Sequence, residues 1–190
     1  MGKQGLRRHG QAHQRRWKQI AIFLLTVLAG LLAGEAISDF GLRNNYRNKP
    51  SLIASGLLRA DILIQGSSRA EFSTKPWVIE EALGLPTYNL GKEGNPILED
   101  FMTLRLYLKH YPKPKVVLLE THQGFFEAHE LQPKVYRYLP YLEDSVLADL
   151  ATRADPYIVT LSKFPYLSYA RYNQLVLRKV LEGWGQYFRG

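Results

Sequence analysis

A glycine followed by two hydroxyl groups and a guanidinium is the stretch of this sequence best suited to chemistry. This stretch, Gly66-Ser67-Ser68-Arg69, comes directly after Asp61–Gln65, a short apolar run that predicts a buried strand of a parallel sheet. Ligands bind at the carboxyl ends of such strands, and the glycine permits a sharp turn that presents the next side chains. Ser68 is therefore the first candidate for a nucleophile and Ser67 the second. The competing interpretation is that Ser67, Ser68 and Thr74 only cap and turn the chain into a helix.

Two further strands are predicted downstream. Leu85–Leu90 is a short strand-like run that ends in the turn Gly91-Lys92-Glu93-Gly94-Asn95, and Lys115–Thr121 has the clearest pattern of a buried strand. Strands that alternate with helices predict right-handed βαβ units and a parallel sheet. The expected fold class is α/β with a three-layer, flavodoxin-like parallel sheet. We expect this sheet to be incomplete, because no fourth strand can be assigned.

Capping residues and apolar spacing predict the helices between these strands. Thr74 is the expected cap of a helix over Lys75–Leu83 that ends at Gly84. Asn95 is the expected cap of a longer helix with Pro96 at its first position. That helix should bury a face formed by Ile97, Phe101, Leu104 and Leu108. Residues 122–141 are expected to form a loop, and two more helices are predicted near residues 142–152 and 166–187.

The net charge of +8 is concentrated at the amino terminus. Residues 1–19 hold six basic and no acidic side chains, and the rest of the chain is nearly balanced. Residues 20–34 are uncharged, and a helix over residues 18–37 would span roughly 30 Å, the thickness of a bilayer core. Basic residues before such a segment favour a cytoplasmic amino terminus. We therefore expect the lipid bilayer, and not nucleic acid, to be the partner of this region.

A cleaved signal peptide is the main alternative to a permanent anchor, since Gly34-Glu35-Ala36 has small residues at cleavage spacing. The long basic region and the length of the apolar run favour the anchor. The expected protein is single-pass in the cell membrane, with its main domain extracytoplasmic. Its expected parts are a basic cytoplasmic tail (1–19), a transmembrane anchor (20–37), a polar stalk (38–57) and an α/β domain (58–190).

The three predicted strands and the turns that follow them occur in an order that resembles that of the SGNH (GDSL-type) hydrolase superfamily, over about residues 58–125. The similarity is greatest to its membrane-anchored, extracytoplasmic branch, which acts in O-acetylation of surface glycans. Gly66-Ser67-Ser68 matches the block that contains the family's nucleophile, which implies that role for Ser68. Gly94 matches the glycine whose backbone N–H joins the oxyanion hole. Ser67, Arg69 and Asn95 are the candidate substrate-binding residues. Arg69 could bind an anionic substrate or pair with Glu120 or Glu71, and the pairing is expected because an arginine at a strand end usually finds a carboxylate.

Two family features have no match in this chain. No Asn occupies the third block near His122, and the Asp-x-x-His block that supplies the catalytic base is absent. A serine hydroxyl needs a base to become an effective nucleophile. His122 directly follows the third strand and is the best surrogate, His129 lies between acids in a looser context, and His110 is expected at the opposite end of the sheet. A truncated chain, a degenerate non-catalytic member and an unusual base all remain open.

Three functions follow as expectations. The first is a membrane-anchored serine esterase or O-acyltransferase that acts on cell-envelope polysaccharide. The second is a non-catalytic binding or envelope-assembly subunit of the same fold, or a fragment of a split enzyme gene. A phosphate-binding module is the third, although Gly-Ser-Ser-Arg lacks the spacing of known phosphate loops. No cofactor or metal is expected, and a chain without cysteine has neither disulfides nor thiolate ligands.

Overall fold

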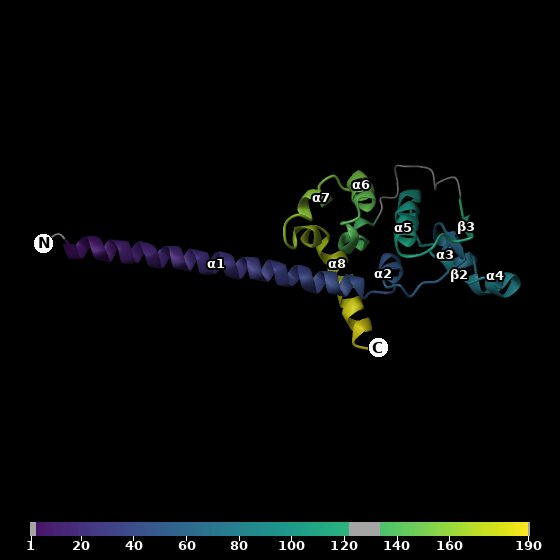
Figure 1. The fold of residues 1–190 in the computed structure, drawn as a ribbon, viewed down its shortest axis with the longest axis horizontal. Helices are drawn as coiled ribbons and strands as arrows, with labels where there is room; N and C mark the ends of the chain where they lie inside the picture. Colours follow the sequence, from purple (N-terminus) through teal and green to yellow (C-terminus); the bar gives the residue numbers. More distant parts are fainter. Residues whose placement is uncertain (1–2, 122–133, 190) are drawn as a thin grey trace.

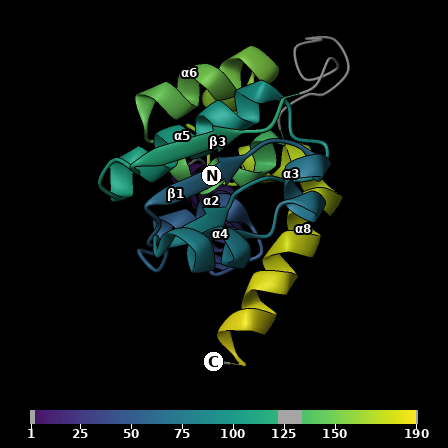
Figure 2. The same cartoon turned by 90° about the vertical axis from the view of Figure 1, so that its right-hand side faces the viewer.

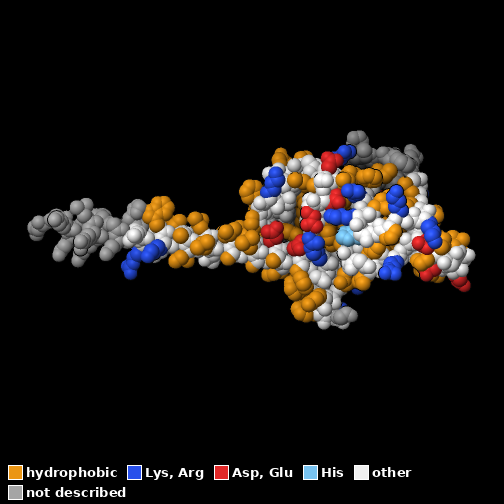
Figure 3. All heavy atoms as spheres, viewed as in Figure 1, with side chains coloured by type: hydrophobic (Ala, Val, Ile, Leu, Met, Phe, Trp, Pro, Cys, Tyr) orange, Lys and Arg blue, Asp and Glu red, His pale blue; other side chains and the backbone are white. Residues whose placement is uncertain are grey.

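The chain begins with one long helix that extends away from a folded body (Figure 1). The computed structural model describes residues 3–121 and 134–189, with side chains from residue 14 onward. Helix α1 covers Lys3–Arg43, and its apolar side chains between residues 20 and 33 are almost all exposed (Figure 3). Its 30-residue stretch Gln14–Arg43 has a mean hydropathy of 2.3 in its most apolar window. By length and composition this helix can span a membrane.

Three short parallel strands form the sheet, as the sequence predicts. Strand β1 (Ile62–Gln65) lies in the middle, between β2 (Thr87–Asn89) and β3 (Val116–Leu119). Ile62 pairs with Thr87 on one side and with Val116 on the other. All four residues of β1 are buried. The carboxyl ends of the three strands therefore meet at one edge of the sheet.

The expected three-layer arrangement is not what the structure has. Most of the apolar core lies on the face of the sheet that Leu63 occupies. Two short helices follow β1 in the chain, α3 (Ser68–Ser73) and α4 (Pro76–Leu83), and α4 has no buried residue. All four side chains of β3 are between 39% and 46% exposed, so neither face of this strand is fully covered. The protein is mostly helical with a small parallel sheet.

The core is built from helices around Leu63. Helix α2 (Lys49–Ala54) packs on α5 (Ile97–His110), α5 packs on α6 (Ser145–Ala154), and α6 packs on α7 (Ile158–Leu161). The 3-10 turn η2 (Val135–Arg137) packs on α8 (Leu167–Tyr187), and the next turn, η3 (Leu139–Tyr141), packs on α1. A non-helical residue, Asn173, divides α8 into two parts.

Helix α5 buries a different face from the one the sequence predicts. Ile97, Phe101 and Leu108 are 41%, 54% and 40% exposed. The buried residues of α5 are Glu99, Asp100, Met102, Thr103, Leu106 and Tyr107. Apolar spacing predicts the wrong buried face here, because polar partners stabilise the two buried carboxylates. The cap also differs, since Pro96 and not Asn95 occupies the N-cap position.

The expected polar stalk is part of the folded body. Helix α1 continues without interruption to Arg43, and Leu42, Asn45, Asn48 and Ile53 are at least 95% buried. Asn48 donates hydrogen bonds from Nδ2 to Ser51 Oγ and to the carbonyl oxygen of Arg137. In the sequence this stretch looks like a linker because its residues are polar. In the structure those polar residues make hydrogen bonds within the folded body.

Candidate functional site

The loops that follow the three strands lie against one another at the carboxyl edge of the sheet. The backbone N–H of Lys92 donates to the carbonyl oxygen of Gly66 at 3.0 Å, which joins the β2 loop to the β1 loop. On the other side, Glu120 N–H donates to the carbonyl oxygen of Gln65 at 2.9 Å. The sequence correctly predicts that these turns meet. We call residues 66–71, 91–95, 100 and 120 the strand-end site.

Ser67 is used to build this site. Its Oγ donates to Oε2 of Glu120 at 2.8 Å, and its backbone N–H donates to the same oxygen at 3.1 Å. Ser67 Oγ also accepts from the backbone N–H of Arg69, which makes Ser67 the N-cap of α3. With 5% of its surface exposed, Ser67 holds the turn together. This is the capping role that the competing interpretation predicts for it.

Gly66 is required where the chain turns from β1 into α3. Its φ of +138° is one that other residues rarely adopt. A Cβ at this position would lie 2.8 Å from Cβ and 2.9 Å from Oε2 of Glu120. The glycine therefore allows the carboxylate of Glu120 to approach the turn closely.

Ser68 is the first residue of α3 and is half-buried. In the described part of the chain its hydroxyl makes no hydrogen bond, in contrast to that of Ser67. Arg69 is exposed and forms no salt bridge with a described residue, so its expected pairing with Glu120 or Glu71 is wrong. Glu71 pairs instead with Lys92. Ser68 and Arg69 are the two side chains of this turn that remain available to a ligand.

The β2 loop is held by α3 and by α5. Glu71 accepts from Lys92 Nζ at 2.8 Å and from the backbone N–H of Glu93 at 2.6 Å. Gly94 adopts a φ of +66° and is half-buried, and no hydrogen bond among the described residues joins it to Ser68. Asn95 is 2% exposed and donates from Nδ2 to Asp100 at 2.9 Å. Asn95 thus supports the loop from inside and does not face a substrate.

Asp100 is a buried carboxyl group at this edge that the sequence interpretation missed. Burial raises its pKa to about 6, more than the Asn95 amide and the Gly66 N–H lower it, and the charges of Glu99 and Glu120 raise it further. Its position in the first turn of α5 by itself indicates only a favourable contact with the helix dipole. The signal in the sequence that could have revealed it is the adjacent acidic pair Glu99-Asp100, which is buried on α5 together with Met102.

The negative charge of Glu99 is paired inside the protein. Its side chain is 2% exposed and pairs with Arg137 Nη1 at 2.8 Å, and Oε2 accepts from the backbone N–H of Lys134 at 3.1 Å. This buried ion pair joins α5 to η2. Such a pair fixes α5 and η2 relative to each other, because loss of either partner would leave the other charge buried and unpaired.

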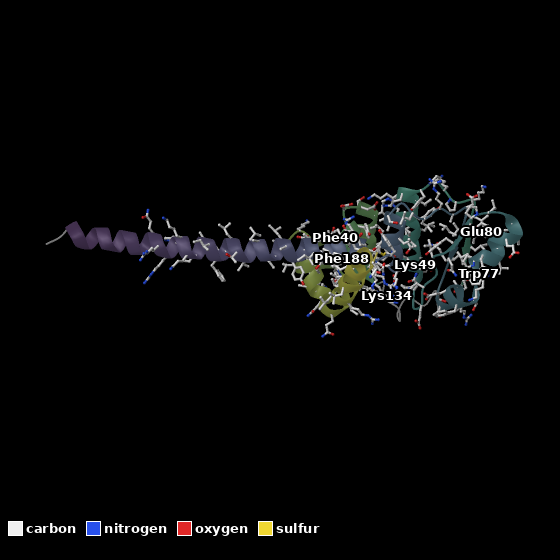
Figure 4. The ribbon with its side chains drawn as sticks, turned by 90° about the horizontal axis from the view of Figure 1, so that it is seen from below. Phe40, Lys49, Trp77, Glu80, Lys134 and Phe188 are labelled. Carbon is white, nitrogen blue, oxygen red and sulfur yellow. The ribbon has the colours of Figure 1, made fainter. Side chains whose placement is uncertain are left out.

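A basic cavity of about 210 Å³ opens beside the β2 loop. Six cationic side chains and one carboxylate line it together with Asn48: Arg47, Lys49, Lys92, Arg137, Arg178, Lys179 and Glu182. Lys49 Nζ donates to the carbonyl oxygen of Asn89 at 2.9 Å, and burial lowers its pKa with a further contribution from the charge of Lys92. Figure 4 shows Lys49 in the folded body near the end of α1. The excess of positive charge suits an anionic ligand.

The histidines do not complete a catalytic site within the described residues. His122 and His129 lie outside those residues. His110 is at the opposite end of the sheet, as predicted, where it lines a cavity of about 540 Å³ with Asp61 and Pro86. Among the described residues, no cluster of three metal-ligating side chains is present. The described part of the site therefore has a presented hydroxyl, buried carboxyls and nearby cations.

Comparisons with known proteins leave the family of this chain open. No protein-family model, no curated protein and no solved structure matches it. The likeness to SGNH hydrolases therefore rests on the spacing of the Gly-Ser-Ser and Asn-Leu-Gly-x-x-Gly turns alone.

Proposed function

We propose that this protein is a membrane-anchored serine esterase or O-acyltransferase that acts on cell-envelope polysaccharide. Helix α1 is long and apolar enough to span the membrane, and the basic residues before it favour a cytoplasmic amino terminus. The folded body would then be extracytoplasmic, where envelope polysaccharides occur. This proposal follows the resemblance to SGNH hydrolases.

The observation that carries the proposal is the contrast between two neighbouring serines. Ser67 is tied to Glu120 and buried, while Ser68 is half-buried with a hydroxyl free of partners among the described residues. Ser68 stands at the carboxyl end of a central parallel strand, where α/β proteins place their reactive groups. The structure of the turn thus favours Ser68 over Ser67 as the nucleophile.

The proposed reaction is acyl transfer through Ser68. Its Oγ attacks the ester carbonyl carbon, a base accepts the hydroxyl proton, and the alcohol leaves with that proton as the acyl-serine forms. Water then takes the acyl group in an esterase, and a sugar hydroxyl takes it in a transferase. His122 is the proposed base, and the backbone N–H groups of Ser68 and Gly94 are the proposed oxyanion donors.

The second candidate function is that of a non-catalytic binding or assembly subunit. The basic cavity favours it, because six cations line this cavity and the carboxylates of Glu71, Glu99 and Glu182 pair with only four of them. Polar side chains of the strand-end site also form hydrogen bonds with one another, as Ser67 does with Glu120 and Asn95 with Asp100. In this case the protein would bind an anionic envelope polysaccharide without changing it.

A fluorophosphonate probe and an activated acetate ester distinguish the two candidates. The full-length protein in detergent should be labelled and should release acetate, and Ser68→Ala should abolish both. Ser73→Ala is the matched control, because Ser73 is an exposed serine at the other end of α3. His122→Gln should retain binding and lose turnover.

Absence of labelling and of acetate release would refute the enzymatic proposal. Binding of acidic but not neutral polysaccharide would then support the second candidate. That binding should weaken in Arg47→Gln and persist in Arg153→Gln, since Arg47 lines the basic cavity and Arg153 pairs with Asp149 on the surface.

A further inference from the structure

Helices α1 and α8 cross at two glycines. A Cβ at Gly41 would lie 2.7 Å from Val180 Cγ1 and 2.9 Å from Trp184 Cδ1, and Gly183 packs directly on the Gly41 carbonyl group. Figure 2 looks along α1 and shows the last part of α8 at full length, so this part runs crosswise to α1 (Figures 1 and 2). A helix in this orientation lies parallel to any membrane that α1 crosses.

The two sides of α8 contact different levels of α1. On one side, Trp184 Nε1 donates to the carbonyl oxygen of Ile37 at 3.1 Å. On the other side, Asn45 Nδ2 donates to the carbonyl oxygen of Lys179 at 2.9 Å, and Tyr46 N–H donates to Gln186 Oε1 at 2.8 Å. Ile37 lies six residues before the end of α1 at Arg43, which corresponds to roughly 9 Å along the helix axis, and Asn45 and Tyr46 lie beyond that end. The Trp184 side of α8 therefore faces the exposed apolar part of α1, and the Lys179 side faces the folded body.

An exposed apolar stripe occupies the side of α8 that faces the apolar part of α1. Leu177, Leu181, Trp184 and Phe188 follow one another at intervals of three or four residues, which places them on one helix face. Leu177, Leu181 and Phe188 are 56%, 62% and 75% exposed. We call these four residues the α8 stripe. Figure 3 shows apolar side chains on this side of the projecting end of α8.

Aromatic contacts make the α8 stripe continuous with α1. The ring centroids of Phe40 and Trp184 are 4.5 Å apart, and those of Trp184 and Phe188 are 5.6 Å apart. Figure 4 shows Phe40 and Phe188 together at the junction of the two helices. Aromatic side chains are enriched at the level of lipid headgroups. The exposed apolar surface of α1 thus extends sideways onto α8.

The turn before α8 reaches still further along α1. A Cβ at Gly34 would lie 3.3 Å from the Tyr166 ring, which places this ring beyond Ile37 on the apolar side. Phe164 and Leu167 flank Tyr166 and are 54% and 40% exposed. Two separate elements with exposed apolar residues therefore lie beside the segment of α1 that can cross a bilayer.

We propose that α8 is an interfacial helix that lies on the lipid bilayer, with the α8 stripe and the Phe164–Leu167 turn at the boundary between headgroups and acyl chains. The inference depends on the proposed anchoring of α1. An amphipathic helix binds in this way when one face is apolar and the other polar, and here Lys179, Glu182 and Gln186 form the polar face. The body would contact the membrane through two elements and have one orientation on it.

The absence of cysteine makes a site-specific test direct, because single cysteines can be introduced without removing native ones. The full-length protein is reconstituted in vesicles of phosphatidylcholine and phosphatidylglycerol, and a fluorophore is attached at Leu177→Cys or at Leu175→Cys. Leu175 and Leu177 are 55% and 56% exposed, and two residues apart they point to opposite sides of α8. Leu175 is therefore a matched control in residue type, helix and exposure.

Lipids with a nitroxide near the headgroup should quench the label at position 177 at least about two-fold more than at 175, because interfacial helices bury their apolar face roughly 5–10 Å into the bilayer. Equal quenching at both positions would overturn the inference. Quenching at 177 that appears only on dilution of protein in lipid would also overturn it, since a second copy would then cover the stripe before dilution.

A label at Leu28→Cys separates this inference from the anchoring on which it depends. Leu28 is an exposed residue in the middle of the apolar part of α1. Strong quenching at 28 by a nitroxide deep in the acyl chains, without the contrast between 175 and 177, would leave the anchor and reject the interfacial helix. No quenching at 28 would reject both.

Discussion

Replacement of Asp100 by Asn should stabilise the protein at neutral pH. Burial, together with the charges of Glu99 and Glu120, raises the pKa of this carboxyl from an ordinary value of 3.8 to about 6 in the folded state. Between these two pH values the folded state binds more protons than the unfolded state. The free energy of unfolding therefore falls as the pH rises from about 4 to about 6, and above that range the cost is constant.

The size of this cost follows from the two pKa values. At about 1.4 kcal/mol for each pKa unit, the ionised Asp100 destabilises the fold by about 3 kcal/mol at pH 7. An Asn side chain is neutral and its Oδ1 can still accept from Asn95. It loses the acceptor that faces Gly66 N–H, which offsets about 1 kcal/mol of the gain. The expected net stabilisation by Asp100→Asn is about 2 kcal/mol.

Urea denaturation of the full-length protein in non-ionic detergent, at several pH values from 4 to 8, measures this effect. The wild type should lose stability across pH 4–6, and Asp100→Asn should not. Asp144→Ala is a control of opposite sign: burial raises the pKa of Asp144, but the N–H groups of Leu147 and Val146 lower it more. This variant should lose about 1 kcal/mol at pH 7. An Asp100→Asn protein with the wild-type pH dependence would refute the reasoning.

Three other substitutions test the packing of the site and the helix crossing. Gly66→Ala should cost at least about 2 kcal/mol in urea denaturation, because the left-handed φ and the adjacent carboxylate both oppose a Cβ; a cost below half of that would contradict this. Arg137→Met should cost about 3–5 kcal/mol by leaving Glu99 buried and without its cation, and an unchanged stability would contradict this. Gly183→Leu should separate α8 from α1 and speed tryptic cleavage after Arg178, whereas unchanged cleavage would show that the helices do not cross closely in solution.

The sequence predicted the sheet and its turns well because their signals are local. Apolar runs of four or five residues identify β1 and β3, a glycine directly follows β1, and Gly84 ends α4 with a φ of +63° as expected. The N-terminal apolar helix was also predicted. Its span was too short, however, because polar residues after Ile37 suggested a stalk, while α1 continues to Arg43.

The errors occur where a tertiary contact outweighs the local pattern. Apolar spacing in α5 predicts a buried Phe101, but Arg137 and Asn95 pair with Glu99 and Asp100 and so allow the polar side to face inward. No spacing rule contains those partners, which lie on other elements. The sequence ranks Ser68 above Ser67 as a candidate nucleophile, but it does not reveal the hydrogen bond to Glu120 that gives Ser67 a structural role.

The unbroken path of α1 from the tail into the folded body has a mechanical consequence. Helix α1 has no break between its apolar segment and Leu42, which is completely buried. The folded body is therefore held in one orientation relative to that segment. In the proposed membrane anchoring, the strand-end site would stand at a constant height above the lipid. In the same proposal, one residue inserted into α1 between its apolar segment and Leu42 would turn the folded body by roughly 100° and move it by about 1.5 Å relative to the lipid, so the length of this helix would set the position of the site.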